Sequence, residues 1–274
     1  MKKLLGAIAA LAMTVGLAAC GTPANQGTTN PNQLVVGMEA GYPPFNWTQN
    51  DDSNGGVKIQ GTNQYAGGYD VEIAKLVAQK LGKELVIVKT EWDGLTPALI
   101  SGKIDAIIAG MSPTEERKAT IDFTDSYYDS QLVLVVKKGS KYEKATSLAD
   151  FAGAKVTAQL NTFHYSVIDQ IPGVEKVTAM DNFPAMRVAL QAGTIDAYVS
   201  ELPEALSAQA ANSDFVMVKL TNGFQTSPED TQTAVGVRKD STLTKEINEA
   251  LKTISSEQRL QIMQDAIKNQ PAAE

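Results

Sequence analysis

One nine-residue pattern occurs twice in the chain and restricts its fold more than any other feature. Residues 98–106 read ALISGKIDA and residues 189–197 read ALQAGTIDA, so the form A-L-x-x-G-x-I-D-A recurs at an offset of 91 residues. Each copy predicts a helix end, a glycine turn and a buried strand. We therefore expect two similar α/β lobes. Asp105 and Asp196 precede the two strands, and we expect them to cap the backbone of the turn.

The segment that leads to the first copy alternates between strands and helices. Apolar, β-branched runs predict strands, and apolar residues at helical spacing predict helices between them. The expected elements are a strand at 33–38, a helix capped by Asp70 and closed by Gly82, a strand at 84–88, a helix at 93–100 and a strand at 104–109. This order requires a parallel sheet with right-handed crossovers. The polar residues 49–64 predict a loop or a small hairpin.

The first repeated strand leads into a segment that can receive an anion. Residues 112–117 read SPTEER, which contains a helix-start signature, and a helix start presents free backbone N–H groups. Ligands of open α/β sheets bind at the carboxyl ends of strands, so Ser112 and Arg117 predict a receptor of carboxylate size. The alternative is that Arg117 forms a surface ion pair with Glu115 or Glu116.

The second repeated strand, expected at 195–199, is followed closely by a carboxylate, Glu201. If the strand ends of two lobes face each other, Arg117 and Glu201 lie on opposite sides of one cleft. The small molecule complementary to that pair is a zwitterion, with an α-carboxylate for Arg117 and an α-ammonium for Glu201. The alternative is that Glu201 is a solvated loop acid beside Glu204.

The composition argues against several classes of function. The 274 residues carry a net charge of −7 without a basic cluster, which argues against nucleic acid as a partner. The chain has one Cys and one His, a shortage that argues against a zinc site or an iron–sulfur cluster. A single Cys also excludes an intrachain disulfide. We expect neither a metal nor a cofactor.

The N-terminus has the features of a targeting segment. Two lysines precede an apolar run at 4–17 that is too short to be a stable membrane span. The LAACG that follows resembles a bacterial lipobox, which implies a signal peptide at 1–19 and lipidation of Cys20. Residues 20–33 then form a flexible tether, and the fold begins near Leu34. We expect a protein anchored by lipid to the cell membrane on its extracytoplasmic side.

Four longer runs of the chain are GYPPFNW, YDVEIAKLVAQKLG, WDGLTPALISGKIDAIIAGMSPTEERKATIDFTDSYY and IDAYVSEL. In these runs the chain, from about residue 34 to 251, resembles the polar amino-acid-binding proteins of ABC importers. The resemblance implies a two-lobed α/β fold of the type II periplasmic-binding-protein kind, in which each lobe is a mostly parallel sheet flanked by helices. It places lobe 1 at 34–126 and 236–274, lobe 2 at 132–230, and hinge strands near 127–131 and 231–235.

The resemblance also implies which residues contact a ligand. Arg117 would clamp the α-carboxylate with help from Ser112 and the backbone at Thr162, while Gly110, Ser112 and Glu201 would take the α-ammonium. Two aromatic rings would sandwich the ligand side chain, and three residues would lie near its tip. The implied contacts are Glu39, Tyr42, Phe45, Trp92, Gly110, Met111, Ser112, Arg117, Gln159, Thr162 and Glu201.

The chain departs from the family pattern in the second lobe. Glu201 stands where the family usually has Asp, so its carboxylate reaches one methylene further. Asn161 and Phe163 replace the usual Gly and small hydroxyl residue on either side of Thr162. The contacts implied for lobe 2 therefore need the structure as a test.

The choice of ligand depends on the far end of the implied site. Glu39 adds a negative charge there, and Tyr42 and Trp92 can stack on a cation, so we expect arginine, lysine or histidine. Glutamine or another polar amino acid is the alternative. The implied partners are the permease and ATPase subunits of an ABC importer, and the binding protein itself is expected to be a monomer.

Two other classes of function fit the same fold. One is a dehydratase-like enzyme, for which Glu39, Glu201 and His164 are the candidate acid–base groups. His164 lies just inside an expected helix start, where a surface or capping role is the better interpretation. The other class is a ligand sensor that presents its closed form to a separate signalling protein.

Overall fold

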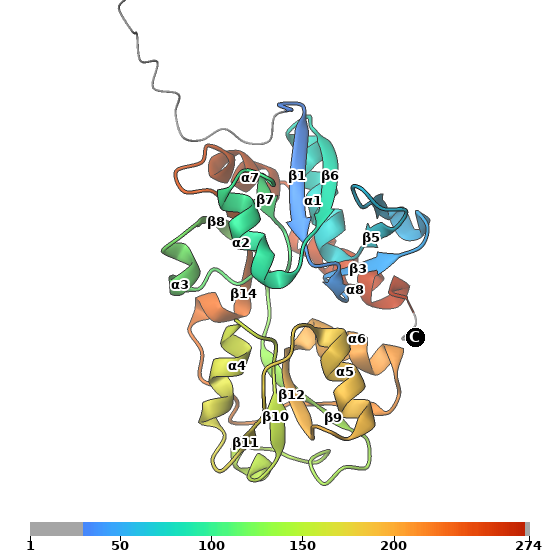
Figure 1. The fold of residues 1–274 in the computed structure, drawn as a ribbon, viewed down its shortest axis with the longest axis vertical. Coiled ribbons are helices and arrows are strands. Elements are labelled where there is room, and N and C mark those ends of the chain that lie inside the picture. Colours follow the sequence, from blue (N-terminus) through green and yellow to red (C-terminus); the bar gives the residue numbers. More distant parts are fainter. Residues whose placement is uncertain (1–29, 272–274) are drawn as a thin grey trace, which may run out of the picture.

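The computed structural model describes residues 30–271. The predicted signal peptide 1–19, the lipidation site Cys20 and most of the tether 20–33 lie outside the described residues. Figure 1 shows two lobes stacked along the long axis of the molecule, with the chain crossing between them. The expected two-lobed α/β fold is therefore confirmed.

Lobe 1 is built on a five-stranded sheet with the order β6-β1-β7-β14-β8. β1 lies between β6 and β7 and is parallel to both, as the sequence predicts, whereas β14 is antiparallel to both of its neighbours. The strands are β1 (Gln33–Met38), β6 (Glu84–Lys89), β7 (Ala106–Ile107), β8 (Asp122–Asp129) and β14 (Gln232–Val237). The helices of this lobe are α1 (Tyr69–Lys80), α2 (Trp92–Ile100), α3 (Glu115–Lys118), α7 (Leu243–Leu251) and α8 (Ser256–Asn269).

A second, four-stranded sheet extends lobe 1 and includes the polar segment 49–64. Its order is β2-β3-β5-β4, with every pair antiparallel. The strands are β2 (Gly41–Tyr42), β3 (Asn46–Gln49), β4 (Val57–Lys58) and β5 (Tyr65–Gly67), and a short 3-10 helix, η1 (Ser53–Gly55), lies between β3 and β4. The segment is therefore closer to the expected hairpin than to a loop.

Lobe 2 has a five-stranded sheet with the order β11-β10-β12-β9-β13. β10 is parallel to β11 and β12, while β9 is antiparallel to β12 and β13. The strands are β9 (Leu132–Lys137), β10 (Lys155–Thr157), β11 (Glu175–Lys176), β12 (Ala197–Glu201) and β13 (Phe215–Val218). The helices are α4 (Phe163–Val167), α5 (Phe183–Ala192) and α6 (Leu202–Ala211), with 3-10 helices η2 (Leu148–Phe151) and η3 (Ile168–Gln170).

The chain passes between the two five-stranded sheets twice. It leaves lobe 1 between β8 and β9, at residues 130–131, and returns through η4 (Pro228–Thr231) into β14. The two passages lie side by side, because the backbone N–H of Ser130 donates to the carbonyl of Thr231 at 2.8 Å. β14 and β8 continue this pairing into lobe 1, where Gln232 faces Asp129.

The structure corrects two local predictions and confirms a third. α1 begins after Gly68, and the side chain of Asp70 turns into the core instead of capping the helix. The strand expected at 104–109 is shorter than predicted and spans only Ala106–Ile107. The helix start predicted within residues 112–117 is confirmed, since Thr114 caps the short α3 and its hydroxyl accepts from the Arg117 N–H at 3.4 Å.

Candidate functional site

A small chamber lies between the two lobes, where the strand ends of both sheets meet. Eleven residues line it: Tyr42, Trp92, Gly110, Ser112, Arg117, Gln159, Thr162, Phe163, His164, Phe183 and Glu201. Eight of them are ligand contacts that the family resemblance implies. The free volume between the side chains is about 10 Å³, which is room for about one water molecule. The lobes are therefore closed on each other, and any larger ligand requires them to separate.

Arg117 lies on α3 and brings a positive charge to the lobe 1 side of the chamber. Its Nη1 donates to the Ser112 carbonyl at 3.0 Å, and its guanidinium carbon is 5.0 Å from the centre of the Trp92 ring. Burial lowers the pKa of Arg117 to about 10, so the group is still charged at neutral pH. Glu115, one of the two expected surface partners, pairs with Lys118 at 2.9 Å.

Glu201 is the last residue of β12 and brings a carboxylate to the lobe 2 side. It is only 1% exposed, so it is not the solvated loop acid of the alternative interpretation. Its Oε1 lies 3.3 Å from His164 Nε2, and its Oε2 is buried without a hydrogen-bond partner among residues 30–271. A buried polar atom without a partner costs about 1–3 kcal/mol. A ligand that donates to Oε2 removes that cost.

Ser112 and Gly110 line the chamber together with the charged groups, and hydrogen bonds within the protein orient the Ser112 hydroxyl and the Gly110 backbone. The Ser112 hydroxyl donates to the carbonyl of Asp230 at 2.8 Å, which leaves its oxygen as an acceptor. Gly110 has a φ of 62°, a left-handed conformation that glycine adopts without strain, and its N–H donates to the Tyr127 hydroxyl at 3.1 Å. This turn redirects the chain between β7 and Ser112.

Aromatic rings close the chamber in a different way from the expected sandwich. The Tyr42 ring stacks on the Phe183 ring of lobe 2, with centroids 4.5 Å apart and planes at 14°. The Trp92 ring lies against Arg117, and its Nε1 donates to the carbonyl of Asn161 at 3.4 Å. Tyr42 and Trp92 thus both line the chamber, as expected, but each is partnered by protein groups in this closed form.

Glu39 lies next to the chamber without lining it. Gln159 Nε2 donates to Glu39 Oε2 at 3.1 Å across the interface between the lobes. Burial raises the pKa of Glu39 to about 7, and the hydrogen bond from Gln159 opposes this shift. Glu39 also borders a wider cavity of about 460 Å³, whose lining includes Lys89, Glu91 and Arg187.

Two further expected contacts lie in the core of lobe 1. Phe45 is fully buried and packs edge-on against the rings of Tyr69 and Tyr128. Met111 is 2% exposed and belongs to the same apolar cluster. Neither residue lines the chamber, although Phe45 supports it by stacking on Tyr42 at 4.9 Å.

Three lining residues are not among the expected ligand contacts: Phe163, His164 and Phe183. His164 is 5% exposed and faces Glu201, so a surface or capping role is wrong. Phe183 begins α5 as Trp92 begins α2, and the two positions differ by the same 91 residues as the repeated pattern. The repeat, extended back to the helix starts, was the signal that could have found Phe183.

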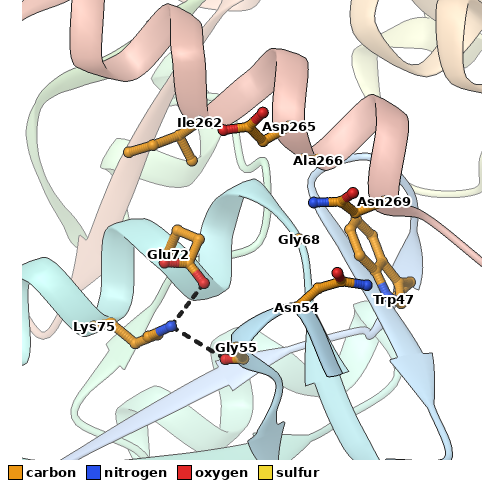
Figure 2. A pocket seen from close by; sticks show the side chains of 10 residues that line it. All are labelled: Trp47, Asn54, Gly55, Gly68, Glu72, Lys75, Ile262, Asp265, Ala266 and Asn269. Carbon is orange, nitrogen blue, oxygen red and sulfur yellow. Dashed lines mark hydrogen bonds and ion pairs between the residues drawn. The ribbon is translucent and has the colours of Figure 1, made fainter. Parts of the chain in front are cut away.

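Another cavity, of about 330 Å³, lies in lobe 1 alone, between η1, α1 and α8 (Figure 2). Its charged groups have protein partners: Lys75 pairs with Glu72 at 2.8 Å and donates to the Gly55 carbonyl, and Asp265 accepts from Gln261. It offers no opposed charges from the two lobes. The interlobe chamber is therefore the better candidate for a binding site.

Residues 30–271 lack both a membrane-spanning helix and a cluster of metal ligands. No helix in this part of the chain is both long and apolar enough to cross a membrane. The same residues contain no group of three or more His, Cys, Asp or Glu side chains that could hold a metal ion.

Comparison with known proteins points to one family. The sequence model of one protein family, the bacterial extracellular solute-binding proteins, family 3, matches residues 34–267. The arginine-binding extracellular protein ArtP of Bacillus subtilis (strain 168) is 30% identical over 271 residues, which cover 95% of this chain and 96% of ArtP. The ABC transporter glutamine-binding protein GlnH of the same strain is 30% identical over 281 residues, 99% of this chain and 100% of GlnH.

A solved structure agrees with these relatives. An amino acid ABC transporter substrate-binding protein from Streptococcus pneumoniae Canada MDR_19A, bound to L-arginine, superposes with a TM-score of 0.76 at 28% identity. The match covers 86% of this chain and 94% of that structure. The likeness thus extends over both lobes.

Proposed function

The chain belongs to the bacterial extracellular solute-binding proteins of family 3, and from this premise we propose that it captures a free L-amino acid for an ABC importer. Its close relatives are binding proteins of transporters, and it is a protein of that kind rather than an enzyme. The permease and the ATPase subunits of the importer are its proposed partners.

One observation carries the proposal: opposite charges meet at a single chamber from different lobes. Arg117 approaches from lobe 1, and the buried Glu201, with an unpartnered Oε2, approaches from lobe 2. An α-carboxylate matches the guanidinium, and an α-ammonium matches Glu201. A zwitterion thus supplies to each lobe the charge that the lobe lacks.

The other lining groups complete the recognition of the amino-acid backbone. The Ser112 oxygen and the Gly110 carbonyl accept from the α-ammonium together with Glu201. The backbone at Thr162, where α4 begins, donates to the α-carboxylate. Each charge-assisted hydrogen bond contributes about 1.5–3 kcal/mol, so a few of them suffice for micromolar affinity, about −8 kcal/mol.

We propose a cationic side chain for the ligand, with arginine ahead of lysine and histidine. Glu39 is the acid next to the chamber, and Gln159, which lines the chamber and donates to Glu39, brings no positive charge. A bound cation lowers the pKa of Glu39 from about 7 and favours its ionised form. Glutamine is the alternative, and the names of the relatives include both arginine and glutamine.

Binding is proposed to couple to closure of the lobes. Lobe 1 (34–126 and 236–274) and lobe 2 (132–230) rotate about hinges at 127–131 and 231–235, and the closed form docks on the permease. The protein acts as a monomer, anchored to the extracytoplasmic side of the cell membrane by lipid on Cys20 after removal of residues 1–19. Radiolabelled palmitate retained by the wild-type chain and lost in Cys20→Ala tests the anchor.

A thermal-shift screen of residues 24–274 against the twenty amino acids tests the ligand. Ligand at a thousandfold excess over Kd stabilises the native state by about 4 kcal/mol. We expect a large shift with arginine or lysine that vanishes in Arg117→Ala and persists in Lys118→Ala, the adjacent cation that pairs with Glu115. A shift with glutamine alone rejects the cationic ligand, and no shift with any amino acid rejects the zwitterion site.

A further inference from the structure

Asn161 lies on the rim of lobe 2, outside the chamber lining, in a conformation that few side chains tolerate. Its φ is 55°, which favours glycine and, less strongly, asparagine. The side chain is exposed, so burial does not explain why a residue larger than glycine stands there. Its contacts give the explanation.

Three hydrogen bonds join Asn161 to lobe 1. Its side-chain Nδ2 donates to Asp93 Oδ1 at 2.9 Å. Its backbone carbonyl accepts from Trp92 Nε1 at 3.4 Å and from Arg117 Nη2 at 3.3 Å. Because the donors and acceptors belong to different lobes, all three bonds exist only when the lobes are closed.

We propose that the Asn161 side chain is a positioning element that latches the closed form through Asp93, at the mouth of the chamber and outside the ligand site. This inference rests on the proposed function, since it concerns how long a captured amino acid is retained. Glycine can adopt the same backbone conformation and keep both carbonyl contacts. The bond to Asp93 is therefore what asparagine adds at this position.

The latch acts on release rather than on capture. An amino acid first meets the open lobes, in which Asn161 and Asp93 are apart, so the association rate does not depend on their bond. Escape requires the bond to break. Loss of one hydrogen bond to a charged acceptor at an exposed position is expected to raise the dissociation rate about threefold to tenfold and to leave the association rate unchanged.

Asn161→Gly is the direct test, and the chain offers a matched control. Asn54 is also an exposed asparagine with a positive φ, of 53°, but it lies beside the lobe 1 cavity of Figure 2, away from the interlobe chamber. Asn54→Gly thus reproduces the gain in backbone freedom without touching the latch. Both variants are made in the full chain and compared with the wild-type protein and with Asp93→Ala.

Stopped-flow tryptophan fluorescence with L-arginine, and separately with L-glutamine, gives the two rate constants. We expect faster dissociation in Asn161→Gly and in Asp93→Ala, no change in Asn54→Gly, and no further change when the first two are combined. Equal dissociation rates in Asn161→Gly and Asn54→Gly would overturn the latch.

Small-angle scattering keeps the test independent of the ligand. If the wild-type chain binds none of the twenty amino acids, the proposed function fails, and the latch is judged on the ligand-free protein alone. A larger mean radius of gyration in Asn161→Gly than in Asn54→Gly then supports it. Equal radii in the two variants reject it.

Discussion

In lobe 1 the repeated unit runs through Asp105 into β7, and in lobe 2 it runs through Asp196 into β12. Each aspartate forms the same pair of bonds with a neighbouring parallel strand. The Asp105 N–H donates to the Val35 carbonyl at 2.7 Å while its carboxylate accepts from the Val35 N–H at 3.0 Å. Asp196 makes the equivalent bonds with Lys155, both at 2.8 Å. The predicted capping of the turn is wrong, because the carboxylates reach across to β1 and β10.

The two units differ in what surrounds this shared contact. Asp105 is 5% exposed and lies 3.4 Å from Arg238, which also donates to the Ile104 carbonyl. Asp196 is half-buried at the edge of lobe 2. The strand ends differ more, since β7 leads to Arg117 and β12 ends at Glu201. The repeated residues therefore serve the fold, and the chemistry resides in the residues that the repeat does not share.

The charge at the second strand end gives the largest expected effect. In Glu201→Gln the ligand loses a buried charged acceptor for its α-ammonium, so affinity should fall about a hundredfold, or about 2.7 kcal/mol. Isothermal titration with the amino acid selected by the screen measures this, with the exposed Glu175→Gln of the same lobe as the control. Unchanged affinity in Glu201→Gln would contradict the proposal that Glu201 binds the α-ammonium while Arg117 binds the α-carboxylate.

The two aspartates should differ in their contribution to stability. Asn retains an oxygen that accepts the backbone N–H, so Asp196→Asn should lower the free energy of unfolding by only about 0.5 kcal/mol. Asp105→Asn also leaves the buried Arg238 without this negative partner and should cost about 2 kcal/mol. Urea unfolding of both variants is the measurement. Equal losses would mean that the burial of Asp105 and its pair with Arg238 add nothing to the shared contact.

The last expected effect is a dependence of stability on pH, and it concerns another contrast between the lobes. Lobe 2 buries Glu204 against Arg187, at 2.9 Å, whereas lobe 1 buries Asp70 against the neutral Tyr127 and Asn46. Burial raises the pKa of Asp70 from 3.8 to about 7, although both hydrogen bonds oppose the shift. The folded state therefore binds more protons than the unfolded state between these values, and stability falls as pH rises, by at most about 1.4 kcal/mol per pH unit.

Asp70→Asn should remove this contribution and flatten the decline between pH 5 and 7. Urea unfolding at several pH values checks it against the wild-type chain. Glu39, with a pKa also raised to about 7, contributes a slope of the same sign in both proteins, so the difference between them isolates Asp70. An identical slope in the variant would show that Asp70 is ionised throughout this range.

Local patterns predicted much of the fold. The strands β1 and β6 and the end of helix α5 at Gly193 follow from residues close together in sequence. Asp70 was misassigned because its partner Tyr127 lies 57 residues away. A capping pattern and a buried acid look alike until the tertiary contact is known.

The same limit applies to the site. Arg117 and Glu201 were predicted to share a cleft because the repeat relates their strands, and the structure brings them to one chamber. His164 was wrongly expected at the surface, since imidazole side chains occur on surfaces, in cores and in binding sites alike. Whether such a side chain lines the chamber depends on which rings pack against each other in the interface between the lobes.

The position of β14 has a consequence for the order in which the protein is made. β8 pairs with no strand of its sheet except β14, which begins at Gln232, after all strands of lobe 2. As the chain emerges N-terminus first, lobe 2 can therefore complete its sheet before β14 is available to pair with β8. A chain that stops before Gln232 lacks the strand that lies between β7 and β8, so its lobe 2 sheet is complete while its lobe 1 sheet is not.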